Sequence, residues 1–144
     1  MEEKARIDIG ACSLRALRSL PHGMCVCGAL ISKTRVDPMF LPEQLRALKL
    51  DLYNCQGGVE VSHGTCIADG MFLEKCRISK LPTGLIVGDL IYVSNCKDLM
   101  DLPKDMLLSL DGRVYYNNHT GFAGNKEKLE ELQERFPGQI KTLF

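Results

Sequence analysis

Apolar residues recur along this chain with a period of about 21 residues. The pair Leu-Pro occurs at Leu20-Pro21, Leu41-Pro42, Leu81-Pro82 and Leu102-Pro103, at intervals of 21, 40 and 21 residues. The interval of 40 is close to two periods, so one copy near residue 61 has lost the pair, and Val61-Ser62 stands there. A fixed period of this length indicates a repeat architecture, in which each copy forms one structural unit.

Two further columns keep the same period. One holds small residues: Cys12, Thr34, Cys55, Cys76, Cys96 and Asn117. The other lies three residues before each of these and is aliphatic throughout: Ile9, Ile31, Leu52, Leu73, Val93 and Val114. Columns in register over consecutive copies predict that equivalent residues stack on one another in the fold.

The residues around the aliphatic column alternate between apolar and polar, as in Leu50-Asp51-Leu52-Tyr53. A period of two predicts a short strand with one buried face. Stacked copies then place equivalent strands side by side in a parallel sheet, over a core that no single copy could form. Segments such as Leu85-Ile86-Val87 are too short for helices, and we expect them to form extended segments or short strands.

The C-terminal segment follows a different pattern. Asn125 can cap a helix that runs to about Phe136, with Leu129, Leu132 and Phe136 on one stripe, and Pro137-Gly138 ends it. We therefore predict one domain over 1–144, made of a solenoid at 7–122 and a capping helix at 124–137. No comparable cap precedes Ile7, so the first coil is expected to be open.

Each copy reads approximately Leu-Pro-x-x-Leu-x-Val-x-Gly-x-Leu-x-Leu-x-x-Cys-x-x-Leu, which resembles the leucine-rich repeat. The short period and the Leu-Pro pair are similar to repeats of bacterial proteins, including secreted effectors and their ubiquitin-ligase relatives. The resemblance implies a mainly β solenoid of five to six coils that binds a protein partner. Residues 57–68 depart from the pattern, because Gly57-Gly58 and His63-Gly64 replace apolar positions. The ligase-type catalytic domain has no counterpart in this sequence.

If the aliphatic columns face inward, their strand neighbours face the solvent. One predicted outward row is Asp8, Leu30, Asp51, Phe72, Tyr92 and Arg113, and the next is Gly10, Ser32, Tyr53, Glu74, Ser94 and Tyr115. Exposed aromatic residues among charges are typical of binding surfaces, although neighbouring strands can also bury them in part. The sequence predicts partner-binding residues at Asp51, Tyr53, Phe72, Glu74, Tyr92, Arg113 and Tyr115.

Composition narrows the class of partner. The formal net charge is zero, and no apolar run approaches the ~20 residues of a membrane helix. We therefore expect no nucleic acid and no membrane as partner. Met1–Arg6 is charged and leads into no apolar signal segment. The sequence favours a cytoplasmic protein, or one that enters a host cell without a signal peptide, and its seven cysteines are expected to be reduced thiols.

Catalytic and metal chemistry is weakly represented. His22, Cys25 and Cys27 lie together, but a closed zinc site draws four ligands from paired motifs, and no second pair exists. We predict no metal and no cofactor. Cys55, Cys76 and Cys96 are interpreted as buried structural residues. Two alternatives to protein recognition stay open: a cysteine-dependent hydrolase or transferase near His63, and a structural protein that assembles, as a homodimer for example, through the N-terminal coil.

Overall fold

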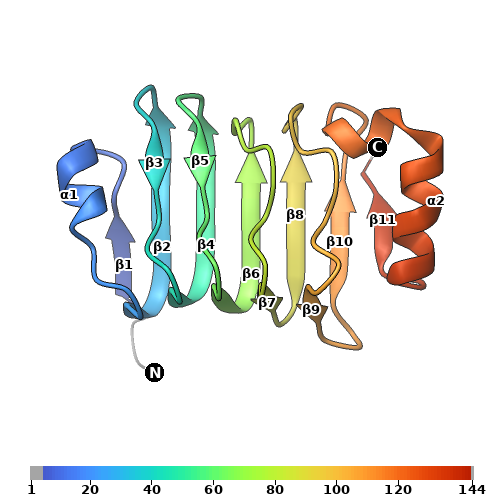
Figure 1. Ribbon diagram of the computed structural model, residues 1–144, viewed down its shortest axis with the longest axis horizontal. Coiled ribbons are helices and arrows are strands. Elements are labelled where there is room, and N and C mark those ends of the chain that lie inside the picture. The colour runs from blue at the N-terminus through green and yellow to red at the C-terminus, as the bar shows by residue number, and fades with distance from the viewer. Residues whose placement is uncertain (1–4, 144) are drawn as a thin grey trace.

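The computed structural model describes residues 5–143 and shows a parallel β-solenoid of about five turns with a short C-terminal helix. The mainly β repeat fold predicted from the sequence is confirmed. Figure 1 shows the strands side by side along the long axis, with α1 at the N-terminal end and α2 at the C-terminal end.

The strands of the main sheet run in the order β1-β2-β4-β6-β8-β10-β11, and every pairing is parallel. Their bounds are Ala5–Asp8 (β1), Cys25–Arg35 (β2), Arg46–Cys55 (β4), Cys66–Glu74 (β6), Leu90–Ser94 (β8), Arg113–Tyr116 (β10) and Ile140–Thr142 (β11). The shorter strands are Met39–Phe40 (β3), Val59–Glu60 (β5), Ile86–Val87 (β7) and Leu107–Leu108 (β9). The helices are Leu14–Arg18 (α1), the 3-10 turn Gly121–Gly124 (η1) and Lys126–Arg135 (α2).

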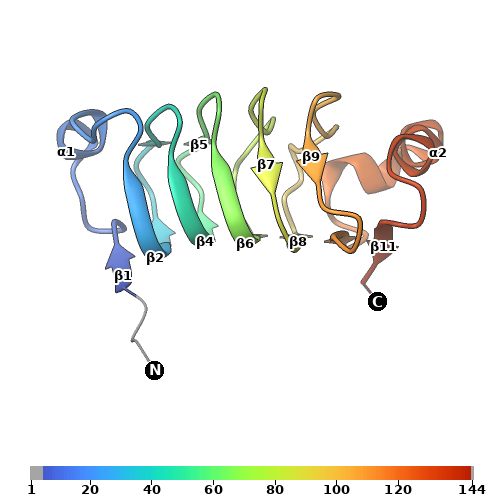
Figure 2. The ribbon, with the colours of Figure 1, turned by 90° about the horizontal axis from the view of Figure 1, so that it is seen from below.

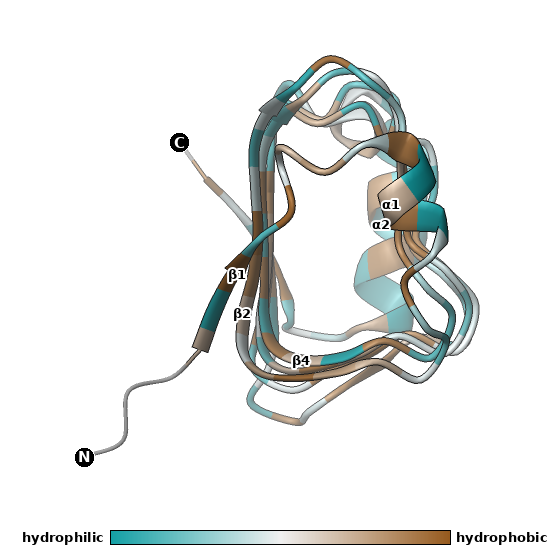
Figure 3. Cartoon of the chain, turned by 90° about the vertical axis from the view of Figure 1, so that its left-hand side faces the viewer, coloured by the Kyte–Doolittle hydropathy of each residue, from teal (hydrophilic) through white to brown (hydrophobic). Residues whose placement is uncertain are grey.

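The chain turns a corner near the start of the longer strands β2 and β4. Viewed along the solenoid in Figure 3, the sheet forms one side of the coil, and α1 and α2 lie on the opposite side. The pairing register of β2 with β4 shifts at this corner, between Val26 and Ala29. A Cβ on Gly28 would lie 1.8 Å from the carbonyl oxygen of Ala5, and one on Gly88 would lie 1.9 Å from that of Ala68. These corners require glycine because two backbones approach closely there.

The core is made of stacked apolar columns, as the repeat predicts. One column joins Leu30, Leu50, Met71, Ile91 and Val114, and the next joins Leu52, Leu73, Val93 and Tyr116. All of these side chains are buried. Each buried aliphatic side chain contributes roughly 1.5–3 kcal/mol, so the stacked columns hold the coils together.

The predicted register is wrong at both ends of the ladder. Ser32, not Ile31, pairs with Leu52, so Leu30 and Ser32 face inward and Ile31 lies beside Asp51 on the outer face. Near the C-terminus, Tyr116 pairs with Val93, and Val114 pairs with Ile91. The outer neighbour of Tyr92 is therefore Tyr115 rather than Arg113, which lies beside Leu90.

A left-handed residue ends the main strand in four consecutive coils. Thr34, Asn54, Lys75 and Asn95 have φ between 48° and 56°. The residue that follows each one is buried: Arg35, Cys55, Cys76 and Cys96. Arg35, rather than Thr34, is thus the equivalent of the cysteines, and its guanidinium donates to the carbonyl oxygens of Gly10, Cys12 and Pro38.

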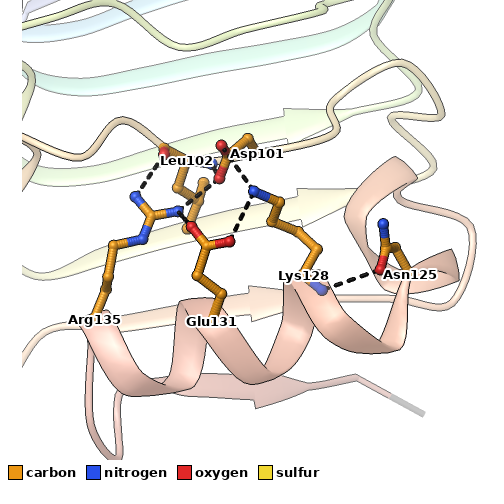
Figure 4. A network of polar contacts seen from close by, with 6 residues as sticks. All are labelled: Asp101, Leu102, Asn125, Lys128, Glu131 and Arg135. Carbon is orange, nitrogen blue, oxygen red and sulfur yellow. Dashed lines mark hydrogen bonds and ion pairs between the residues drawn. The ribbon is translucent and has the colours of Figure 1, made fainter.

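The predicted C-terminal helix is confirmed as α2. The side chain of Asn125 accepts a hydrogen bond from the Lys128 N–H, and Leu132 is fully buried in the core. Figure 4 shows Asp101 of the last coil between Lys128 and Arg135, at 3.2 Å and 2.6 Å from their side-chain nitrogens. The repeat pattern of the sequence does not predict α1, η1 or β11.

The irregular copy at 57–68 forms an ordinary coil. Val59 and Val61 are buried with the core, and Val61 occupies the place of the lost Leu-Pro leucine. A Cβ on Gly57 would lie 2.3 Å from the Val36 carbonyl oxygen, which explains the glycine. No helix within residues 5–143 is long and apolar enough to cross a membrane.

Candidate interaction surface on the sheet

The seven predicted partner-binding residues all lie on the outer face of the main sheet, and all are half-buried. The pairing register places Asp51, Phe72, Tyr92 and Tyr115 in one row across four strands. Tyr53 and Glu74 pair in the next row towards the carboxyl ends of the strands. Arg113 lies on the other side of the central row. We call these seven residues the sheet-face surface.

The Phe72 ring lies over a glycine. A Cβ on Gly70 would be 2.8 Å from Cε2 of Phe72, so the absence of a side chain there leaves room for the ring against the sheet. The centroid of the Phe72 ring is 6.1 Å from that of the Tyr92 ring. The Lys49 ammonium lies 4.6 Å from the centroid of the Phe72 ring. Aromatic pairs and cation–π contacts at these distances restrain the rings. The surface therefore presents ordered aromatic groups.

Charged groups surround the aromatic residues. The Lys75 ammonium lies 5.7 Å from the centre of the Tyr53 ring. The guanidinium of Arg113 is turned towards the backbone, where it donates to the carbonyl oxygen of Gly112 at 2.7 Å. Asp51 and Glu74 alternate with the aromatic side chains across β4 and β6. An aromatic centre among separated charges is the composition of many protein interfaces.

The cysteine column carries thiols buried inside the solenoid. The Cys76 and Cys96 sulfurs each lie 3.3–3.6 Å from backbone carbonyl oxygens of their own and the preceding coil. A hydrogen bond shared with Cys76 lowers the pKa of Cys55 to about 7 and raises that of Cys76. Burial raises the pKa of the Cys96 thiol. All three side chains are closed off from solvent, so an external substrate cannot reach them without an opening of the coil.

The histidines of the candidate metal and enzyme sites bind neighbouring turns. Nδ1 of His22 accepts a hydrogen bond from the Glu43 N–H at 3.0 Å. Nδ1 of His63 lies 3.0 Å from the Thr83 hydroxyl oxygen. Among residues 5–143, no three His, Cys, Asp or Glu side chains are grouped so that they could hold a metal ion. These histidines link successive coils at the turns that follow the Leu-Pro positions.

Sequence reasoning missed a hollow of about 520 Å³ at the carboxyl ends of the main strands. Its lining includes Gln56, Lys75, Arg77, Lys97, Asp98 and His119. The signal was present in the sequence, because Gln56, Arg77 and Lys97 each directly follow a cysteine of the buried column. We call this feature the basic hollow.

Comparison with known protein families, curated proteins and solved structures gives no match for this chain.

Proposed function

We propose that this protein is a recognition module that binds a protein partner through the sheet-face surface. The row of Phe72, Tyr92 and Tyr115 supports the proposal, because three aromatic side chains stand side by side on adjacent strands of an outward-facing sheet. Little side-chain entropy is lost when these rings are immobilised by a partner. The charged side chains around them favour partners of complementary charge. The absence of nucleic acid and membrane among the partners is part of the proposal and follows from the neutral overall charge.

We also propose that the repeat belongs to the leucine-rich, Leu-Pro type of bacterial proteins, including effectors. The support is the recurrence of Leu-Pro at the start of four coils. An effector of this kind acts in the cytoplasm, its own or that of a host cell. The seven free cysteines agree with a reducing compartment.

The proposal is tested by removing the paired rings. Phe72→Ala with Tyr92→Ala should leave the fold intact, because both side chains lie outside the core, while binding of a captured partner falls by at least about tenfold. Lys104→Ala, an exposed change on a distant turn, is the matched control. Folding is followed by urea unfolding, and binding by calorimetry with the purified partner. Unchanged affinity in a folded double variant would exclude this surface.

Gly70→Ala gives a second, milder test. The added methyl group overlaps the Phe72 ring and should displace it without touching the core. Weaker binding with little loss of stability is expected if the position of the ring matters to the partner. An affinity equal to that of the wild type would show that this ring makes no contact with it.

A second candidate function, self-assembly, is favoured by the N-terminal edge. All four residues of β1 are exposed, and β1 pairs only with β2 among the described residues. An unpaired parallel edge offers free N–H and C=O groups to another strand. We propose homodimer formation through this coil as the alternative to a hetero-partner. Light scattering over a range of protein concentrations tests it: a monomer at every concentration would rule it out.

A further inference from the structure

The basic hollow concentrates positive charge in a chain that is neutral overall. Lys75, Arg77 and Lys97 line it with one carboxylate, Asp98, which leaves a formal excess of two positive charges when His119 is counted as neutral. The chain as a whole has a formal net charge of zero. This excess is therefore a local property of the turns at one edge of the sheet.

The solenoid itself brings these cations together. Tyr53, Glu74 and Ser94 pair across β4, β6 and β8, so the residues three positions later, Gln56, Arg77 and Lys97, stack as neighbours. Like charges at directly opposed positions repel one another. Arg77 and Lys97 thus lie on adjacent coils at the same edge of the sheet.

Internal ion pairs leave most of this charge uncompensated. Nε of Arg77 is 3.9 Å from Oδ2 of Asp98, and both side chains are more than half exposed, so the pair contributes little. Within residues 5–143, no carboxylate lies within ion-pair distance of the ammonium groups of Lys75 or Lys97. The hollow thus presents two ammonium groups without a carboxylate partner and a guanidinium held only by one long, exposed ion pair. All three can bind an anion from outside.

We propose that the basic hollow binds a phosphate monoester, carried by a phosphorylated side chain of a protein. A dianion matches the excess of two charges. Arginine and lysine are the side chains that bind phosphate most strongly, the first through its planar fork and the second as a point charge. The volume of about 520 Å³ accommodates a phosphorylated side chain with its flanking backbone.

A protein is the favoured source because the hollow adjoins the sheet-face surface. Lys75 lines the hollow, while its ammonium lies over the ring of Tyr53, a residue of that surface. A partner that covers Tyr53 would extend over the hollow. Only this choice of source rests on the proposed function; phosphate binding itself does not.

The test titrates the full chain, at constant ionic strength, with a short blocked peptide that contains phosphoserine. Saturable shifts of the backbone amide signals of Arg77, Lys97 and His119 are expected. The same peptide with glutamate in place of phosphoserine should bind at least about tenfold more weakly, because it carries one negative charge fewer. Equal binding of the two peptides, or no saturable shift, would overturn the proposal.

Variants locate the site, and two further ligands identify the source. Lys97→Glu and Arg77→Gln should each weaken phosphopeptide binding about tenfold or more, whereas Lys104→Glu, the same charge change on an exposed turn outside the hollow, should alter it less than about twofold. Equal losses of affinity in Lys97→Glu and Lys104→Glu would show that binding depends on overall charge and not on the hollow. Inorganic phosphate should bind more weakly than the peptide. Tighter binding of adenosine monophosphate than of the phosphopeptide would overturn the assigned source.

Discussion

Arg35 takes the place of a cysteine in the buried column and forms hydrogen bonds with backbone carbonyl groups there. Its side chain is only 4% exposed, and its guanidinium satisfies three backbone carbonyl groups of the first two coils. Arg35→Ala removes all of these donors and leaves the Gly10 and Cys12 carbonyls to find other partners. We expect a loss of about 3 kcal/mol in the free energy of unfolding, measured by urea denaturation.

Arg77→Ala is the control for this change, because the Arg77 side chain is largely exposed and, within residues 5–143, forms only one long ion pair. Its effect on stability should stay within about 0.5 kcal/mol. Similar losses in both variants would mean that the buried hydrogen bonds of Arg35 contribute nothing specific.

The buried thiol of Cys96 makes stability depend on pH. Burial raises its pKa above the ordinary value of 9.0, so the folded chain keeps a proton that the unfolded chain releases as the pH rises past 9.0. The free energy of unfolding must therefore fall above this pH. We expect its decrease between about pH 8 and pH 10 to be smaller in Cys96→Ala than in the wild type. An identical decrease, measured by urea denaturation, would show that this thiol does not contribute.

Single residues also explain where the sequence misled. Leu30 and Ile31 are adjacent and both aliphatic, so the alternation alone could not decide which one faces inward. Arg35 concealed the equivalent of the cysteines and shifted the alignment to Thr34. Tyr116 occupies a core position beside Phe122, with ring centroids 5.3 Å apart. Its column otherwise holds the aliphatic residues Leu52, Leu73 and Val93, so a tyrosine was not expected there.

At the scale of elements, the long periodic segments were predictable and the isolated ones were not. The main strands β4, β6 and β8 follow from columns repeated in register. The helix α1 has five residues and no counterpart in the other coils, although Ser13 caps it and Leu17 is buried. The sheet-face surface could be predicted because it alternates with the core. The basic hollow could not be predicted in this way, because its residues lie on turns. The pairing register of the strands decides which turn residues stack on one another.

The helix α2 covers the last coil mainly through apolar contact. Leu132 is fully buried, whereas Asp101 and Glu131 in the polar network of Figure 4 are nearly half exposed. Partly exposed ion pairs contribute little beside a buried leucine. Leu132→Ala should therefore destabilise the protein by about 2–5 kcal/mol in urea denaturation.

Gln133→Ala, at the exposed neighbouring position of the same helix, should change stability by less than about 0.5 kcal/mol. If Asp101→Ala proved more damaging than Leu132→Ala, the polar network rather than the buried leucine would be what holds α2 in place.

At the scale of the whole molecule, a solenoid has a middle and two ends. Each coil packs only on its neighbours, so the central coils are supported on both sides and the terminal ones on one. Figure 2 shows β1 and β11 at the two ends of the row of strands. The C-terminal end carries α2, but β1 is exposed along its whole length.

This asymmetry predicts a gradient of local stability. Amide hydrogen exchange should be slowest in β4, β6 and β8 and fastest in β1. The inward side chains of the first three strands are fully buried, whereas β1 is exposed. The strand β10 should resemble the centre more closely than β1 does, because β11 pairs with it and Phe122 of η1 packs against its Tyr116. If two copies pair through β1, its protection should rise with protein concentration while that of β6 stays constant. Protection in β1 equal to that of β6 in a dilute monomer would contradict the gradient, because an end coil with one neighbour would then open no more readily than a coil enclosed by two.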